Sequence, residues 1–202
     1  MNIDAIMRAA PVIPVLILEE EMDWAALAET FVAASLPVLE VTLRTPLALG
    51  AIRQMSGVEG AIVGAGTVLN ERQLDEAANA GSQFIVSPGL TEPLGKAVIE
   101  SGIAYLPGTA NAGDIMRGLD LGLDRFKFFP AEASGGIPAL QALSAPFANI
   151  RFCPTGGVRP DTAVDWLAVP SVQCVGGTWF VKPGDDLAAV GERARAAAAL
   201  AG

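Results

Sequence analysis

The chain has 202 residues, of which 51% are hydrophobic and 17% charged, so it can build one domain around a substantial core and is not a disordered protein. Its formal net charge is −9 at pH 7 and it contains no run of Lys and Arg, which argues against binding nucleic acid, although a small anion can still bind locally. The sequence has no histidine, so Ser-His-Asp and Cys-His catalysis and zinc sites built on imidazole are excluded, and acid–base chemistry falls to Asp, Glu, Lys or Tyr105.

The first apolar segment, residues 11–18, is interrupted by a proline and followed by three consecutive glutamates. It is too short to span a bilayer, and no small-residue cleavage site follows it. The only two cysteines, Cys153 and Cys174, lie in apolar runs, which is typical of buried free thiols in a reducing compartment. We therefore expect a soluble, cytoplasmic protein with no membrane or nucleic-acid partner.

Eight short apolar segments predict β-strands. In chain order they are residues 12–18, 38–44, 61–68, 83–88, 104–108, 125–130, 150–155 and 172–180. Their hydrophobic residues are nearly continuous, which is typical of parallel strands covered on both faces. Between them lie Ala-rich amphipathic segments that predict helices, among them residues 23–34, 71–80 and 111–121. Asn70, Thr91 and Asn111 stand at expected helix starts as capping residues.

Eight strands, each followed by a helix at a spacing of roughly 25 residues, match the (β/α)8 TIM barrel near its lower size limit. A doubly wound open sheet uses the same units and is the alternative. Against it, no Gly-x-Gly-x-x-Gly follows the first strand, and eight evenly spaced units favour closure. We predict an α/β fold in which residues 1–202 form a single TIM barrel with a short N-terminal helix.

Lys127 lies among aromatic residues in a segment that otherwise resembles a buried strand, residues 125–130. A buried ammonium group is costly unless it is paired or loses its proton. A neutral amine is the nucleophile that forms Schiff bases with carbonyl substrates. Alternatively, Lys127 lies on an outer face and extends its charged end to water. This segment alone favours neither interpretation.

The second strand carries three polar residues at alternate positions, Glu40, Thr42 and Arg44. Alternation places them on one face, and because helices cover the outside of a barrel we expect Glu40 and Arg44 to point into its lumen. A buried structural ion pair is the alternative. The sixth strand directs Lys127 and Phe129 to one side. If Lys127 also points inward, the nearby cation and the apolar walls would favour its neutral, nucleophilic form.

Thr67 ends the third predicted strand and Thr155 the seventh, so both belong to the upper rim, where each could simply close a turn through its hydroxyl. Two glycine pairs follow the last two strands. They are Gly156-Gly157 and Gly176-Gly177, the second followed by Thr178. Many barrels bind phosphate at this place through exposed backbone N–H groups, so we predict a phosphate site here.

Five motifs occur together, in the order given. They are Glu40-Val41-Thr42-Leu43-Arg44-Thr45, Gly64-Ala65-Gly66-Thr67-Val68-Leu69, Ser87-Pro88-Gly89-Leu90-Thr91-Glu92-Pro93, Phe126-Lys127-Phe128-Phe129-Pro130-Ala131-Glu132 and Arg151-Phe152-Cys153-Pro154-Thr155-Gly156-Gly157. With them, the chain closely resembles the 2-keto-3-deoxy-6-phosphogluconate (KDPG) aldolase family, some members of which also act on 4-hydroxy-2-oxoglutarate. The resemblance extends from about Pro11 to the last helix.

The resemblance implies a role for each matching residue. Lys127 would form the Schiff base and Glu40 would be the general acid/base. Arg44 and Thr67 would hold the pyruvate carboxylate. The stereoselectivity and substrate-binding positions are Thr155, Pro88 and Phe129, and the phosphate-binding positions are Gly156, Gly157, Gly176, Gly177 and Thr178. The resemblance further implies a homotrimer that acts on a small 2-oxo acid phosphate, with no metal and no cofactor beyond the covalent Schiff base.

Two departures from the family pattern are visible. Thr178 replaces the serine expected at the phosphate site, which keeps the hydroxyl and adds a methyl group. The segment Gly108-Thr109-Ala110-Asn111 lacks the hydrophobic-Ser-Thr sequence that the family pattern leads us to expect here. Asn111 can still cap the helix that follows.

Two other functions fit parts of the sequence. An aldolase for the C4-epimeric 6-phosphogalactonate substrate shares the lysine and glutamate, but we would expect Pro and Asn after the glutamate instead of Thr42 and Arg44. A non-catalytic phosphate-binding barrel would make Lys127 and Glu40 a structural pair. That function does not explain why the Gly-rich rim accompanies the pair.

Overall fold

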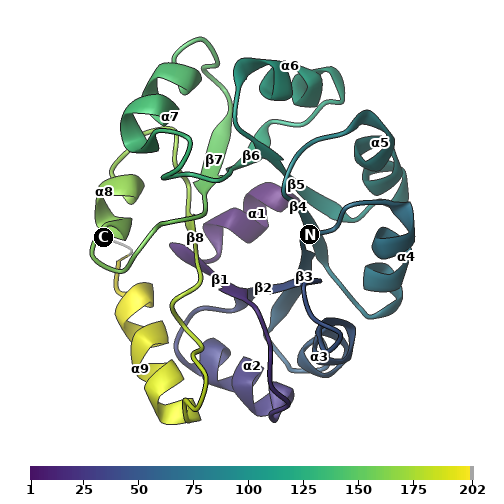
Figure 1. Cartoon of the computed structure of the whole chain (residues 1–202), viewed down its shortest axis with the longest axis vertical. Helices are drawn as coiled ribbons and strands as arrows, with labels where there is room; N and C mark the ends of the chain where they lie inside the picture. The colour runs from purple at the N-terminus through teal and green to yellow at the C-terminus, as the bar shows by residue number, and fades with distance from the viewer. Residues whose placement is uncertain (201–202) are drawn as a thin grey trace.

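The computed structural model describes residues 1–200 as a closed parallel β-barrel inside a ring of helices (Figure 1). The strands are β1 (Val12–Leu16), β2 (Val38–Thr42), β3 (Ile62–Gly66), β4 (Phe84–Ser87), β5 (Ala104–Thr109), β6 (Arg125–Phe128), β7 (Arg151–Pro154) and β8 (Val175–Gly177). The helices are α1 (Ile3–Arg8), α2 (Trp24–Ala33), α3 (Ala48–Met55), α4 (Glu71–Asn79), α5 (Glu92–Ser101), α6 (Ala112–Asp120), α7 (Gly136–Ser144), α8 (Ala163–Leu167) and α9 (Leu187–Ala198). The predicted alternation of strand and helix is confirmed.

Closure of the sheet distinguishes the barrel from an open α/β fold. Each strand pairs in parallel with its neighbour in the order β7-β6-β5-β4-β3-β2-β1-β8. Two parallel bridges, Phe152 to Val172 and Thr155 to Gly176, join β7 to the β8 segment and complete the circle. The predicted barrel is therefore correct and the open sheet is excluded.

Two hydrophobic layers account for the nearly continuous apolar strands. The outer layer lies between strands and helices and includes Leu39 and Val41 of β2. The inner cluster fills the lumen where the strands begin, with Val38 from β2 and Phe84 from β4. Because both faces of each strand are buried, the sequence shows little apolar/polar alternation.

The strand ends differ from the prediction in ways that affect the site. The second strand ends at Thr42, and Arg44 lies in the following turn. The eighth strand is three residues long instead of residues 172–180, with Val172 contributing only an isolated bridge. The sixth ends at Phe128, before a proline that has no N–H for the ladder. Apolar runs predict the existence of these strands but not where pairing stops.

All three predicted capping residues occupy the N-cap position of a helix, and two of them make a side-chain capping hydrogen bond. The side chains of Asn70 and Asn111 accept hydrogen bonds from the backbone N–H groups of Gln73 and Asp114. Thr91 occupies the N-cap position of α5 as predicted, but its side chain makes no capping hydrogen bond. Proline in the first turn of α5 favours the helix start without such a bond.

The short N-terminal helix α1 closes the lower end of the barrel. Ile6 and Met7 are fully buried in the inner cluster, and Figure 1 shows α1 across the middle of the ring of strands. Asp4 fastens the helix, because its carboxylate accepts hydrogen bonds from Arg8 at 2.8 Å and from Arg125 of β6 at 2.7 Å. These guanidinium groups lower the pKa of Asp4 from 3.8 to about 2.

We predict that Asp4→Asn lowers the free energy of unfolding at pH 7 by about 0.5–1 kcal/mol, the range for partly exposed ion pairs. Because the folded-state pKa is depressed, the carboxylate stabilises the fold at pH values above 3.8 and loses this effect as the pH falls toward 2. Urea unfolding of both proteins between pH 7 and pH 3 measures the difference. A difference that does not shrink with falling pH would contradict this role.

Candidate active site

A buried amine and a buried carboxylate meet inside the barrel. Lys127 of β6 directs its Nζ atom to Glu40 of β2, 2.9 Å from Oε1 and 3.2 Å from Oε2. The exposed fractions of the two residues are only 5% and 3%. Lys127 therefore lies in the lumen, and the interpretation that it extends outward to water is wrong. At this distance the two groups can exchange protons directly or through a bound reactant.

Glycines on the neighbouring strands allow close approaches around this pair. Gly66, at the end of β3, has its Cα against the Glu40 carboxylate, and a Cβ there would collide with Oε1 and with the side-chain stem. Gly108 stands beside Lys127 in the sheet register, and a Cβ on it would meet the backbone carbonyl of Pro88. In the sequence, these glycines are only parts of longer motifs, and nothing indicates which atoms they contact. Their physical role requires the sheet register.

The aromatic residues of β6 alternate as predicted. Phe129 lies on the side of Lys127, with its ring centroid 5.4 Å from Nζ. Phe126 packs outward against Gly118 of α6, and Phe128 packs outward against Trp166 of α8 with ring centroids 6.3 Å apart. The amine therefore has an aromatic face on one side and a carboxylate on another.

Arg44 and Thr67 contact each other at the upper rim. The Nε–H of Arg44 donates to Thr67 Oγ1 at 3.1 Å, and Thr67 has a backbone φ of 60°. Arg44 is exposed and follows the end of β2, so the prediction that it shares the strand face of Glu40 inside the lumen is wrong. Thr42 does point inward, where its hydroxyl donates to the carbonyl of Leu16 in β1.

The ends of β7 and β8 form the neighbouring part of the rim. Thr155 is buried, bridges to Gly176 and donates from its hydroxyl to the Cys153 carbonyl at 3.3 Å. Gly156 and Gly157 have φ values of 96° and 86°, which favour glycine. A Cβ on Gly176 would collide with Thr155, and one on Gly177 would collide with the indole of Trp179. Thr178 is exposed beside them.

Tyr105 is not available for acid–base chemistry at neutral pH. It belongs to the outer layer, and its hydroxyl pairs with that of Ser87 at 2.7 Å. Burial raises its pKa to about 12. Without histidine, acid–base chemistry depends on Asp, Glu, Lys or Tyr side chains. Of these, Lys127 and Glu40 form the buried pair inside the lumen.

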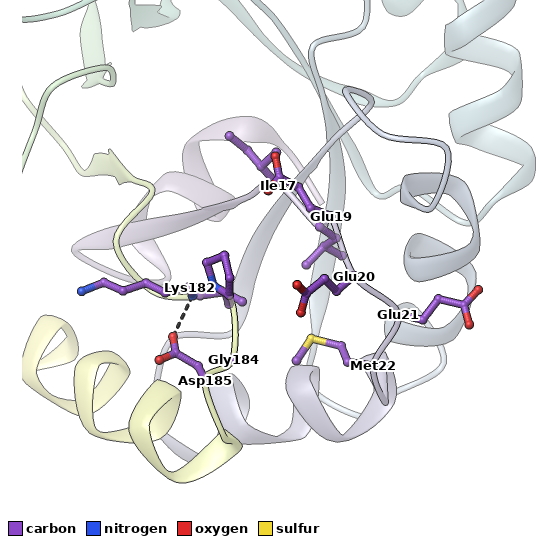
Figure 2. Close-up of a pocket in the computed structure, with 11 residues that line it drawn as sticks. Ile17, Glu19, Glu20, Glu21, Met22, Lys182, Gly184 and Asp185 are labelled. Carbon is purple, nitrogen blue, oxygen red and sulfur yellow. Dashed lines mark hydrogen bonds between the residues drawn. The ribbon is translucent and has the colours of Figure 1, made fainter.

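A separate cavity of about 190 Å³ lies between the loop after β1 and the loop after β8 (Figure 2). Glu19, Glu20 and Glu21 line one side, while Asp185 on the other accepts a hydrogen bond from the backbone N–H of Lys182 at 2.7 Å. The Lys182 side chain extends away from the three glutamates in this view. With these carboxylates around it, the cavity is unsuited to an anionic substrate.

The described part of the chain contains neither a metal-binding cluster nor a membrane-spanning helix. Among residues 1–200, no group of three or more His, Cys, Asp or Glu side chains is arranged to hold a metal ion. Within the same residues, no helix combines the length and hydrophobicity needed to cross a membrane.

Comparison with known proteins agrees with the geometry. The family model described as KDPG and KHG aldolase matches residues 3–192. The chain belongs to this aldolase family. A 2-dehydro-3-deoxy-phosphogluconate aldolase of Zymomonas mobilis is 56% identical over 98% of this chain and 96% of its own length. The KHG/KDPG aldolase of Escherichia coli is 51% identical over 92% of this chain and 87% of its own.

Solved structures show the same fold with ligands. The Zymomonas mobilis aldolase with 3-phosphoglycerate has a TM-score of 0.95 at 56% identity, covering 98% of this chain and 96% of that one. The Legionella pneumophila aldolase, with pyruvate captured as a covalent carbinolamine intermediate, has a TM-score of 0.92 at 40% identity and covers 98% of both chains. A KDPGal structure is 27% identical, with a TM-score of 0.84 over 94% of this chain and 93% of its own.

We predict that Gly66→Ala reduces aldol cleavage by about 10²-fold, because a new methyl group displaces the Glu40 carboxylate by an ångström or more from Lys127. Steady-state kinetics on purified protein measure this loss. Gly89→Ala is the matched control, because a Cβ there meets nothing within 4 Å. Equal activity of the two variants would show that the carboxylate position does not matter.

Proposed function

We propose that this chain is a class I aldolase that cleaves 2-keto-3-deoxy-6-phosphogluconate to pyruvate and glyceraldehyde 3-phosphate. The proposal includes cleavage of 4-hydroxy-2-oxoglutarate to pyruvate and glyoxylate. The single observation that carries it is the buried pair formed by Lys127 and Glu40, 2.9 Å apart in the lumen. A lysine amine that exchanges its proton with a carboxylate can act as nucleophile and be restored after each turnover.

The steps of the reaction follow from these two groups. The Lys127 amine attacks the C2 carbonyl of the substrate, and loss of water leaves a protonated imine that withdraws electrons. Glu40, through a water molecule, accepts the C4 hydroxyl proton as the C3–C4 bond breaks and the aldehyde leaves. The remaining enamine takes a proton, and hydrolysis releases pyruvate. The iminium withdraws the electrons that a metal ion would otherwise polarise, so we propose that neither metal nor cofactor is needed.

We propose that Arg44 and Thr67 bind the carboxylate of the 2-oxo acid. Their mutual hydrogen bond holds the guanidinium at the rim, above the lumen that contains Lys127. An exposed guanidinium offers several donors in a plane, which suits a carboxylate. The exposure of Arg44 supports this role, because its remaining N–H groups are accessible to a ligand.

We propose that Thr155, Pro88 and Phe129 bind the substrate and control its stereochemistry. The Pro88 backbone lies against Gly108, and the Phe129 ring forms the aromatic face beside Nζ. Thr155 presents a hydroxyl at the rim next to Gly176. A fixed hydroxyl near the bond being broken distinguishes two C4 epimers by whether a hydrogen bond can form.

The phosphate would bind where the loops after β7 and β8 meet. We propose that Gly156, Gly157, Gly176 and Gly177 supply closely approaching backbone, and that Thr178 supplies a hydroxyl. Packing also explains glycine at these positions, because a side chain at Gly157 would collide with Glu132 whether or not a ligand is bound. Substituting Gly157 therefore tests packing, and Thr178 is the better position at which to probe phosphate binding.

The gluconate substrate is favoured over its galactonate epimer. Strand β2 ends with Thr42 and the turn after it carries Arg44, where we expect Pro and Asn in the galactonate enzyme. The KDPGal structure is also less similar than the Zymomonas mobilis phosphogluconate aldolase. A non-catalytic phosphate-binding barrel is disfavoured. Burying an ion pair has a desolvation cost, and phosphate binding does not require such a pair.

We further propose that the whole chain acts as one aldolase domain, in the cytoplasm and as a homotrimer. The family match over residues 3–192 supports a single domain. The two free, buried cysteines suit a reducing compartment. Exposed apolar side chains on neighbouring helices, Ile99 of α5 and Met116 and Leu119 of α6, support association of copies.

Borohydride with pyruvate should trap this protein covalently at Lys127, because reduction converts the imine to a stable amine. The chain has only three lysines, Lys96, Lys127 and Lys182, so peptide mass spectrometry distinguishes the sites without ambiguity. Lys182→Met should be trapped as the unaltered protein is, whereas Lys127→Met should not. Labelling at Lys96 or Lys182 alone, or no labelling, would overturn the Schiff-base assignment.

A further inference from the structure

We propose that Glu132, held by the indole of Trp166, is a positioning residue that keeps the Gly156-Gly157 turn open for the substrate phosphate. The inference rests on the proposed function, because it concerns the phosphate end of the same site. Neither residue was identified from the sequence as functional. Glu132 lies four residues beyond Phe128, on the loop that leaves β6, and Trp166 belongs to α8.

The stem of Glu132 lies directly against the glycine turn. A Cβ on Gly157 would fall 2.5 Å from Glu132 Cγ and 2.6 Å from its Cβ, so the turn and the stem are in close contact. The backbone N–H of Glu132 donates to the Gly156 carbonyl at 3.0 Å, and that of Ala131 donates to the Thr155 carbonyl at 2.8 Å. Two residues of the loop after β6, Ala131 and Glu132, therefore contact three consecutive residues of the turn after β7, residues 155–157.

The carboxylate end of Glu132 is fixed from the other side. The Nε1–H of Trp166 donates to Glu132 Oε1 at 3.0 Å. Trp166 is only 1% exposed, and its ring packs against Phe128, the residue next to Lys127. Glu132 itself is exposed on the surface, so without the indole its carboxylate would be free to move. The buried indole thus fixes an otherwise mobile acidic side chain.

The second carboxylate oxygen faces the start of α7. The Cβ position of Gly136, the first residue of that helix, lies 3.5 Å from Glu132 Oε2. A negative charge is favourable near the N-terminus of a helix, so this orientation suits the carboxylate. The Glu132 atoms nearest to the Gly157 Cβ position are Cγ, Cβ and Cα, and not the carboxylate oxygens. A carboxylate that swung back toward the turn would compete with phosphate for the same backbone N–H groups.

This geometry predicts different effects for two conservative variants. Glu132→Gln keeps the stem and an oxygen that accepts from the indole, so KM for the phosphorylated acid should stay within about twofold. Trp166→Phe keeps a ring beside Phe128 but removes the donor, which frees the carboxylate. It should raise KM for the phosphorylated acid about three- to tenfold, as expected for one misplaced charge near an anion.

The second substrate and the double variant separate positioning from general damage. For 4-hydroxy-2-oxoglutarate, which has no phosphate, Trp166→Phe should leave KM and kcat within about twofold. Adding Glu132→Gln to Trp166→Phe should bring KM for the phosphorylated acid back toward the starting value, because the freed side chain then has no charge. Circular dichroism confirms that each variant is folded.

Trp24→Phe is the matched control. Trp24 is also a buried tryptophan, but its indole nitrogen has no hydrogen-bond partner within residues 1–200 and its ring lies against Gly50 of α3. It should change the two KM values equally or not at all. If Trp166→Phe does not fold, Glu132→Ala replaces it. Loss of the stem should then raise KM for the phosphorylated acid alone.

Thr178→Val distinguishes failure of this inference from failure of the proposed phosphate site. A selective KM increase for Thr178→Val without one for Trp166→Phe would overturn the role of Glu132 and Trp166 and leave the site in place. No selective effect for either variant would overturn both. Equal losses on both substrates in folded Trp166→Phe, or no rescue by the double variant, would also overturn the positioning role.

Discussion

The buried ion pair between Lys127 and Glu40 is the constraint to which the interior of this barrel is fitted. Removing two charges from water costs several kcal/mol per ion, and their attraction offsets that cost only when the geometry is good. Here both carboxylate oxygens lie within 3.2 Å of the amine. Apolar side chains would fill the same space in the lumen without the free-energy cost of desolvating two charges. The pair is therefore better explained by the proposed chemistry than by a contribution to stability.

The rest of the lumen makes room for the pair and isolates it. Gly66 leaves space for the carboxylate, and Gly108, the sheet partner of Lys127, lets the Pro88 backbone approach β5 closely. Below the pair, α1 and the inner apolar cluster close the barrel and exclude water. The proposed function therefore has the substrate enter at the upper rim, where Arg44 and the glycine turns lie.

The two cysteines belong to the inner apolar cluster. Cys153 is the sheet partner of Lys127, and it lies with Cys174 in the inner cluster. The Cys153 thiol and burial together raise the pKa of the Cys174 thiol well above its usual range. Cys174 therefore stays protonated and is a poor nucleophile at neutral pH. The prediction of free, buried thiols is confirmed.

The strand pattern was sufficient to predict the barrel and the inward direction of Glu40, which lies within a regular strand where side chains alternate. It left the direction of Lys127 open, and the resemblance to the aldolase family supplied the expectation of a role in the lumen. Alternation failed at Arg44, which lies beyond the last paired residue of β2. The contact between Glu132 and Trp166 was also beyond reach, since 34 residues separate them and neither belongs to a periodic strand. Local sequence patterns predict where a strand or helix lies and which way its side chains point. Contacts between loops depend on how the closed barrel brings distant segments together.

The most direct measurement of the central claim separates imine formation from bond cleavage in Glu40→Gln. The amide keeps the size of the side chain but cannot accept a proton at neutral pH, so turnover should fall by about 10²–10⁴-fold, the usual contribution of a positioned acid/base. Pyruvate should still be trapped by borohydride at Lys127 in the same variant, because the amine remains in the lumen. Cleavage at a rate near that of the unaltered protein would show that Glu40 is only the structural partner of Lys127.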